Sequence, residues 1–246
     1  MSRLAVSLRM SVAAVALTLF FPCAGPSWAG SPQDEICDFK ADFLLGLEDY
    51  AAAIALHREV LHAHNDNALA HYHLGFAYGM TGRTSDEISE YLVAARLGLA
   101  KWDLFLNLGL AYFGQNESQK AANALQTAVK LGPDHLEAHF NLAIVYQSQN
   151  RLNEALREIT AARRLAPEDF DAANTNATIC AEMGDAICAR DIWRHIAQVA
   201  PDCPTARINL MILNQREEQV RQSEPWPDFS NLRTQIDAIR TTQGPR

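Results

Sequence analysis

A 34-residue period runs through this chain from residue 34 to residue 203 without insertion or deletion. The clearest period begins at residue 102, and its regular slots hold Leu108, Gly109, Tyr112, Ala121, Ala128 and Pro133. One period later the same slots hold Leu142, Ala143, Tyr146, Ala155, Ala162 and Pro167. A fixed period of this length is typical of repeat proteins, in which each unit packs only on its neighbours. The period therefore predicts a linear array of stacked units.

Each unit reads as two helices joined by a turn. Residues 121–131 and 155–165 place their apolar residues on one helical face. Pro133, Pro167 and Pro201 then follow the last turn, where proline ends a helix because it has no N–H. The spacing and slots resemble the tetratricopeptide (TPR) repeat, a helix–turn–helix unit of this length. The resemblance implies an all-α fold, a right-handed superhelical solenoid with a concave binding surface.

The frame divides the chain into five repeats and a cap. The repeats span 34–67, 68–101, 102–135, 136–169 and 170–203, a capping helix is expected over 204–222, and 223–246 is expected to be a flexible tail. We count 30–222 as one elongated solenoid. The end repeats depart from the pattern: Lys40 stands at position 7 of repeat one, where we expect it to face water, and repeat five has Ala173, Asn176 and Cys180 at packing positions. We expect Trp193 to refill the volume that these small or polar residues leave.

The first 29 residues have the layout of a secretory signal peptide. Arg3 and Arg9 flank a short basic start, an apolar run of 12 residues spans 10–21, and Ser27-Trp28-Ala29 offers a small-x-small cleavage site. A membrane span needs about 20 apolar residues, so a retained anchor is the weaker alternative. We expect cleavage after Ala29, export to the periplasm or medium, and no stable membrane anchor.

The charge balance excludes one class of partner. Removing residues 1–29 takes away two of the 21 basic residues and none of the 29 acidic residues, so the net charge falls from −8 to −10. No long basic run is present. Nucleic acids and anionic lipids require clustered Lys and Arg, so we expect neither as a partner.

The first helix of each TPR unit lines the concave side, mainly through positions 2, 5, 9 and 12, and this implies a binding groove. The candidate groove residues, with the amides at position 6, are Tyr72, Phe76, Leu106, Asn107, Leu110, Phe113, Phe140, Asn141 and Ile144. The lysines with which some TPR proteins clamp a carboxylate are missing from position 5, so we expect an apolar peptide or helix instead. The alternative is that these residues pack against the chain's own tail or a second copy.

Cysteine and histidine suggest two further sites. We expect Cys180 and Cys188 to face each other across the fifth hairpin, close enough for a disulfide. Five histidines fall within one short stretch, namely His57, His62, His64, His71 and His73. Metal or haem binding by this cluster is one interpretation, although none of the five is spaced i, i+4. Histidine replacing an aromatic residue in a helical interface is the other.

No motif assembles a nucleophile with a base, a phosphate loop or a paired-cysteine zinc site, so we predict no catalytic residues, no cofactor and no enzyme activity. The sequence predicts an exported TPR adaptor or assembly factor that binds an apolar segment of a protein partner. The alternative function is a periplasmic protein that handles metal or haem through the His57–His73 cluster.

Overall fold

The structure is a computed structural model that describes residues 37–201 and 204–223. The predicted signal peptide, the tail after Ser223 and Cys203 lie outside the described residues. Regular structure in the described part is entirely α-helical, which confirms the predicted all-α class. None of the described helices is both long and apolar enough to cross a bilayer.

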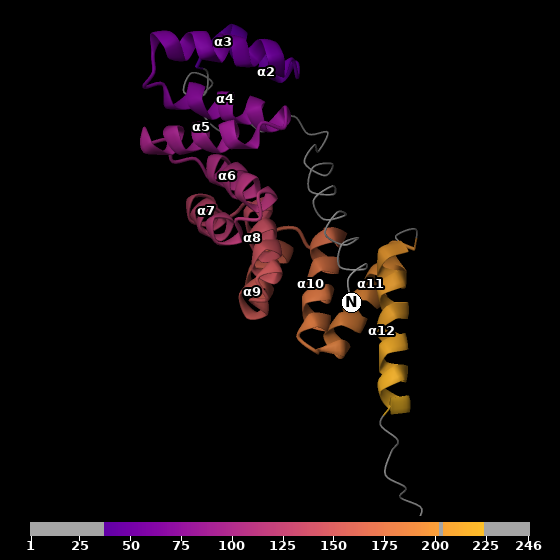
Figure 1. Cartoon of the computed structure of the whole chain (residues 1–246). Helices are drawn as coiled ribbons and strands as arrows, with labels where there is room; N and C mark the ends of the chain where they lie inside the picture. The colour runs from indigo at the N-terminus through magenta and orange to yellow at the C-terminus, as the bar shows by residue number, and fades with distance from the viewer. Residues whose placement is uncertain (1–36, 202–203, 224–246) are drawn as a thin grey trace, which may run out of the picture. The chain divides into compact units, whose positions relative to one another are not determined.

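The helices follow the predicted frame in antiparallel pairs (Figure 1). They are α2 (Phe39–Gly46), α3 (Tyr50–Ala63), α4 (Ala68–Met80), α5 (Thr84–Arg96), α6 (Trp102–Gly114), α7 (Ser118–Leu131), α8 (Leu136–Ser148), α9 (Leu152–Leu165), α10 (Phe170–Glu182), α11 (Ala186–Val199) and α12 (Pro204–Ser223). Helices α2–α9 form one compact unit that ends at Pro167, and α10–α12 form a second that begins at Glu168. The sequence predicted one continuous solenoid, and the structure groups its hairpins into these two units.

The same residue position makes every hairpin turn. Position 15 of each repeat has a positive φ, and its occupants are Glu48, Gly82, Asn116, Asn150 and Gly184. The N–H of the following residue then donates to the carbonyl five residues before it, as in Arg83 N to Tyr78 O at 2.9 Å. This is the hydrogen bond of a Schellman motif, which satisfies carbonyls at the helix end. Glycine and asparagine adopt this conformation readily, so only Glu48 is strained there.

Small residues let the two helices of each hairpin pack closely. Ala53, Ala121, Ala155 and Ala189 at position 20 are all fully buried. At position 8, a Cβ on Gly109 would lie 2.6 Å from Leu125 Cγ. Position 24 supplies the large partner that fills each hairpin, and its occupants His57, Tyr91, Leu125, Ile159 and Trp193 are all buried.

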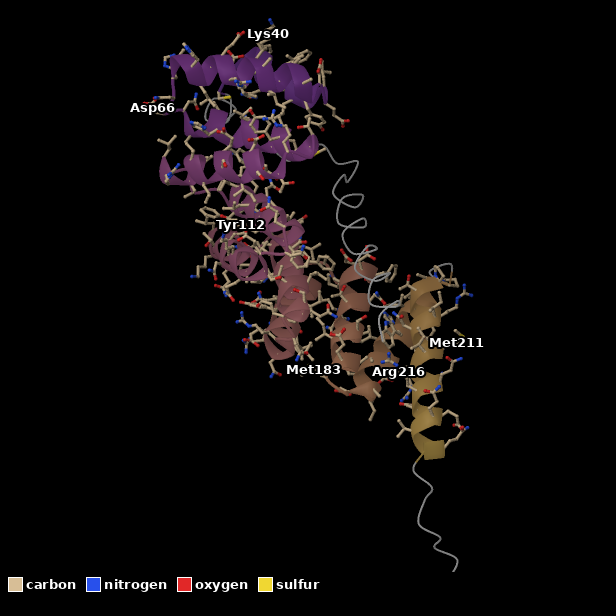
Figure 2. The ribbon with its side chains drawn as sticks, viewed as in Figure 1. Lys40, Asp66, Tyr112, Met183, Met211 and Arg216 are labelled. Carbon is tan, nitrogen blue, oxygen red and sulfur yellow. A yellow bond between two sulfur atoms is a disulfide. The ribbon has the colours of Figure 1, made fainter. Side chains whose placement is uncertain are left out.

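The predictions for the end repeats agree with this packing. Lys40 is exposed on the outer side of the first hairpin (Figure 2). In the second unit, Trp193 is 4% exposed and its indole N–H donates to Asn174 Oδ1 at 2.9 Å. Helix α12 packs mainly on α11, and Arg190 forms an ion pair with Glu217. It also leaves four apolar side chains exposed, namely Ile208, Met211, Ile212 and Val220.

Candidate functional site

The first helices of the first unit form a continuous layer. Helix α2 contacts α4, α4 contacts α6, and α6 contacts α8, whereas the described second helices α3, α5, α7 and α9 form no comparable layer. Helices that stack more closely on one side of a curved array lie on its inner side. We call the surface formed by the exposed side chains of α4, α6 and α8 on that side the inner face.

Seven of the nine predicted groove residues are partly accessible on these helices. They are Tyr72 and Phe76 on α4, Asn107, Leu110 and Phe113 on α6, and Phe140 and Ile144 on α8. The apolar members come from three successive repeats, so their partial exposure recurs along the array. One polar link joins neighbouring repeats, because the Tyr72 hydroxyl donates to Asp103 Oδ2 at 3.0 Å. The inner face is therefore a mainly apolar strip with an acidic margin.

Two predicted groove residues do not belong to this accessible strip. Leu106 and Asn141 are each only 5% exposed. The Asn141 amide donates to Glu137 O at 2.8 Å within its own helix, so that donor is already used. We expected these two side chains to contact a partner, but their burial shows that they are not accessible to one.

A carboxyl group lies between α4 and α5 where the sequence frame calls for alanine. Glu87 occupies position 20, and a Cβ on Gly79 would lie only 2.6 Å from its Oε1 atom. Burial raises the pKa of Glu87 to about 7, although a hydrogen bond from Tyr91 acts in the opposite direction. This group was not singled out from the sequence. The available signal was a glutamate at a repeat position where the other four repeats have alanine.

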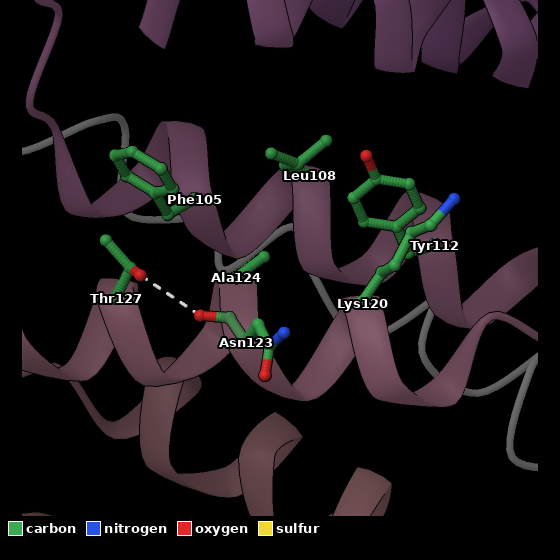
Figure 3. A pocket seen from close by; sticks show the side chains of 7 residues that line it. All are labelled: Phe105, Leu108, Tyr112, Lys120, Asn123, Ala124 and Thr127. Atoms are coloured by element: carbon green, nitrogen blue, oxygen red, sulfur yellow. Dashed lines mark hydrogen bonds between the residues drawn. The ribbon is translucent and has the colours of Figure 1, made fainter.

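A shallow pocket of about 280 Å³ lies between α6 and α7 (Figure 3). Its lining residues are Phe105, Leu108, Tyr112, Lys120, Asn123, Ala124 and Thr127. None of them is a predicted groove residue. Ligand pockets are usually larger, about 300–1,000 Å³, and carry convergent polar groups. Here the Thr127 hydroxyl donates to Asn123 O at 3.0 Å, and Lys120 lies over the Tyr112 ring. These polar groups are already engaged, so the pocket is poorly suited to a small molecule.

The five histidines of the predicted cluster separate into three environments. His62 and His64 are exposed. His71 bridges Glu90 Oε2 at 2.6 Å and Asn65 O at 3.1 Å. His139, at the same repeat position, bridges Glu158 Oε2 at 2.7 Å and Pro133 O at 3.0 Å. These last two are interface residues that fasten a hairpin to the preceding loop.

His57 and His73 do come together, and Cys37 and Asp42 join them. His73 Nδ1 lies 2.7 Å from Asp42 Oδ1, and Cys37 Sγ lies 3.4 Å from His73 Nδ1. Burial, and then the nearby His73, lowers the pKa of His57 to about 4. Burial and then the Asp42 carboxylate raise the pKa of Cys37. For Asp42, burial acts to raise the pKa, but the His73 hydrogen bond brings it below its usual value.

The predicted cysteine pair lies in the second unit. Cys180 on α10 and Cys188 on α11 have Cα atoms 6.0 Å apart, and their sulfur atoms are within bonding distance. That separation lies inside the usual range for a disulfide. Cys37 is the remaining cysteine among the described residues.

Comparison with known proteins gives the family. The tetratricopeptide repeat model matches residues 40–98 and 106–170, so the chain belongs to the tetratricopeptide repeat family. Comparison with curated proteins gives no match.

Solved structures share this fold. One is YrrB, described as a TPR protein with an unusual peptide-binding site, with a TM-score of 0.65 and 24% identity over 69% of this chain and 87% of that one. Two MamA structures each give a TM-score of 0.61. One has 23% identity over 64% of this chain and 86% of that one. The other has 21% identity over 74% of this chain and 98% of that one. At these identities the likeness shows the fold alone.

Proposed function

We propose that this protein is an adaptor or assembly factor that holds an apolar segment of a protein partner on the inner face. The observation that carries the proposal is the strip of partly accessible apolar side chains on α4, α6 and α8. Tetratricopeptide arrays present concave surfaces to partners, and the mechanism is binding by a preformed surface without a covalent step. A peptide-binding site is also part of the description of YrrB, which supports the same class of function here.

The chemistry of the strip selects the kind of partner. Phe76, Leu110 and Ile144 occupy position 9 of successive repeats, and an amphipathic helix or extended apolar segment can bury them together. Asp103 and Glu137 at position 2 add acid along the margin. A partner segment with apolar anchors and flanking basic residues therefore complements this face. The basic flank would accelerate association more than it would strengthen the complex.

The proposal includes a location outside the cytoplasm. The basic start, 12-residue apolar run and Ser27-Trp28-Ala29 site support export, with a mature chain that begins at Gly30. N-terminal sequencing of the protein from its native host tests this part separately. A mature chain that still begins at Met1 would contradict export by cleavage.

A matched pair of substitutions tests the binding face. Phe140→Glu puts a charge on the α8 part of the strip, where Phe140 is half-buried. Leu92→Glu makes the same kind of change on α5, where Leu92 is 40% exposed and lies away from the inner face. In a crosslinking pull-down from the native host, the Phe140 variant should lose the partner that the wild type and the Leu92 variant retain. Helical content should match in all three.

Two outcomes would contradict the proposal. One is capture that survives Phe140→Glu. The other is a Phe140 variant that changes only self-association by the protein alone, since this would show that a second copy covers the strip.

A further inference from the structure

Four side chains with metal-binding atoms converge at the first hairpin of the first unit. Cys37 precedes α2, and Asp42, His57 and His73 come from α2, α3 and α4. One ligand atom from each lies within 4.8 Å of the other three. They come from three helices and the segment before α2, so they are neighbours because of the fold and not because of sequence spacing.

This cluster replaces apolar packing that the other repeats have. His57 occupies position 24, where the later repeats bury Tyr91, Leu125, Ile159 and Trp193. Asp42 occupies position 9, where repeats two to four have Phe76, Leu110 and Ile144. Burying polar groups is costly unless their hydrogen bonds are satisfied. The cluster therefore needs an interaction that offsets the cost of burying its polar groups. The apolar packing of the other repeats needs none.

The protein's own hydrogen bonds supply that interaction only in part. His57 is fully buried, yet its Nε2 atom has no hydrogen-bond partner. That atom lies 3.6 Å from Asp42 Oδ1, while the other ring nitrogen, Nδ1, lies 3.5 Å from Cys37 Sγ. Meanwhile the other Asp42 oxygen, Oδ2, accepts from the backbone N–H of Cys37 at 2.9 Å and of Asp38 at 3.3 Å. These bonds fix the carboxylate so that Oδ1 faces the cluster, as outer hydrogen bonds do for metal ligands.

We propose that Cys37, Asp42, His57 and His73 form a binding site for a divalent transition metal ion, with Zn²⁺ as the expected occupant. A thiolate, two imidazoles and a carboxylate make up a mixed S, N and O set that suits tetrahedral zinc. The thiol proton passes to solvent when the sulfur binds the ion. Because the chain supplies all four ligands, the site is closed and its role is structural.

Three of the six distances between the ligand atoms match tetrahedral coordination, and all four atoms lie within 4.8 Å of one another. Metal–ligand bonds of about 2.0–2.3 Å place tetrahedral ligands about 3.3–3.7 Å from one another. Asp42 Oδ1 lies 3.3 Å from Cys37 Sγ and 3.6 Å from His57 Nε2, and Cys37 Sγ lies 3.4 Å from His73 Nδ1. The 2.7 Å distance between His73 Nδ1 and Asp42 Oδ1 is shorter because it is a hydrogen bond. The ion would take the place of that proton, which His73 would carry on Nε2 instead, and the pair would move apart.

Such an ion would fasten the end of the array. Helix α2 has only eight residues and exposes Phe39 and Phe43, so packing holds it weakly. In repeat arrays the terminal unit has one neighbour and opens first. One ion bound by Cys37 and by residues of α2, α3 and α4 would close the first hairpin onto the second. This stabilising role is independent of partner binding on the inner face.

The test uses the full chain after chelator treatment, with disulfides intact and no thiol reductant present. Zn²⁺ alone is titrated by calorimetry, and Co²⁺ alone is used as a spectroscopic probe. We expect one equivalent of Zn²⁺ per chain, a raised unfolding midpoint, and tetrahedral Co²⁺ bands that include a thiolate charge-transfer band. Cys37→Ser should remove that last band, and His57→Gln should weaken Zn²⁺ binding by at least about tenfold.

Controls separate this site from surface histidines and other thiols. His62→Gln and His64→Gln change exposed members of the same stretch and should bind Zn²⁺ as the wild type does. Octahedral Co²⁺ spectra, binding that is insensitive to both Cys37→Ser and His57→Gln, or binding lost in the His62 and His64 variants would overturn the proposal. The wild-type Co²⁺ spectrum decides the matter even if a ligand variant fails to fold.

Discussion

Replacing Glu87 with glutamine should make the first unit more stable at neutral pH and leave its stability unchanged in acid. Glu87 is half-buried between α4 and α5, in a slot where the other repeats bury alanine. Burial raises its pKa from 4.5 to about 7, so the folded state favours the neutral carboxyl. Glutamine is a neutral side chain of nearly the same shape. The substitution therefore removes the charge while keeping the packing against Gly79.

The sign of the pH dependence follows from the two pKa values. Below about 4.5 the carboxyl is protonated in both the folded and unfolded chain, and it contributes no penalty. As the pH rises from there to about 7, the unfolded chain releases its proton first, so the free energy of unfolding falls. Above about 7 the full penalty is present.

The magnitude is modest because the group is not fully shielded. A pKa raised from 4.5 to about 7 corresponds to a loss of about 3 kcal/mol of folding stability for a group that water does not reach. Solvent reaches part of Glu87, so we expect about 1–2 kcal/mol. The assay is urea unfolding followed by circular dichroism across this pH range, on wild type and the Glu87→Gln variant.

The informative quantity is the difference in unfolding free energy between the two proteins, because other titrating groups cancel in it. This difference should be near zero in acid and should grow until the pH passes about 7. Glu59→Gln, which changes an exposed carboxyl on α3, serves as the control and should show no such growth. A Glu87 difference that stays flat with pH, or that favours the wild type at neutral pH, would show that burial of the Glu87 charge does not destabilise the fold.

Three further predictions concern the turns and the second unit. Glu48→Asn should raise the free energy of unfolding by about 0.5–1 kcal/mol, because Glu48 has φ 61° and Asn116 and Asn150 occupy the equivalent turns; unchanged or lower stability in urea would count against strain there. Trp193→Ala should lower the stability of the second unit by about 3–5 kcal/mol, measured by amide exchange, while partner capture on the inner face persists. Non-reducing peptide mapping of exported protein should find Cys180 linked to Cys188, whose short loop adds about 2–3 kcal/mol; two free thiols would exclude the bond.

The sequence period predicted the fold in detail because it reports a local requirement that recurs. Gly82, Asn116, Asn150 and Gly184 occupy position 15, where every hairpin turn needs a positive φ. The alanines at position 20 report close helix packing in the same way. The helix pairs could thus be placed from the repeat pattern of the sequence alone. The grouping of the hairpins into two units could not, since it depends on contacts between repeats.

The candidate site was predicted less completely, for two physical reasons. Position numbers say which side of a helix a residue occupies but not how far neighbouring helices cover it, and so Leu106 and Asn141 were wrongly counted as accessible. In addition, the i, i+4 spacing rule finds ligands that lie on one helix, and it cannot detect ligands that come from three different helices. The available signal for the Cys37 cluster was that Asp42 and His57 are polar residues in apolar slots of the repeat.

Site-specific photocrosslinking in the native host tests whether the inner face holds a partner. A photoreactive phenylalanine analogue is placed at Ile144 on the inner face and, in a separate protein, at Leu92 on α5. We expect a discrete crosslinked partner from the Ile144 position that is absent from the Leu92 position. Adducts from Leu92 with none from Ile144, or an Ile144 adduct composed only of two copies of this chain, would contradict it.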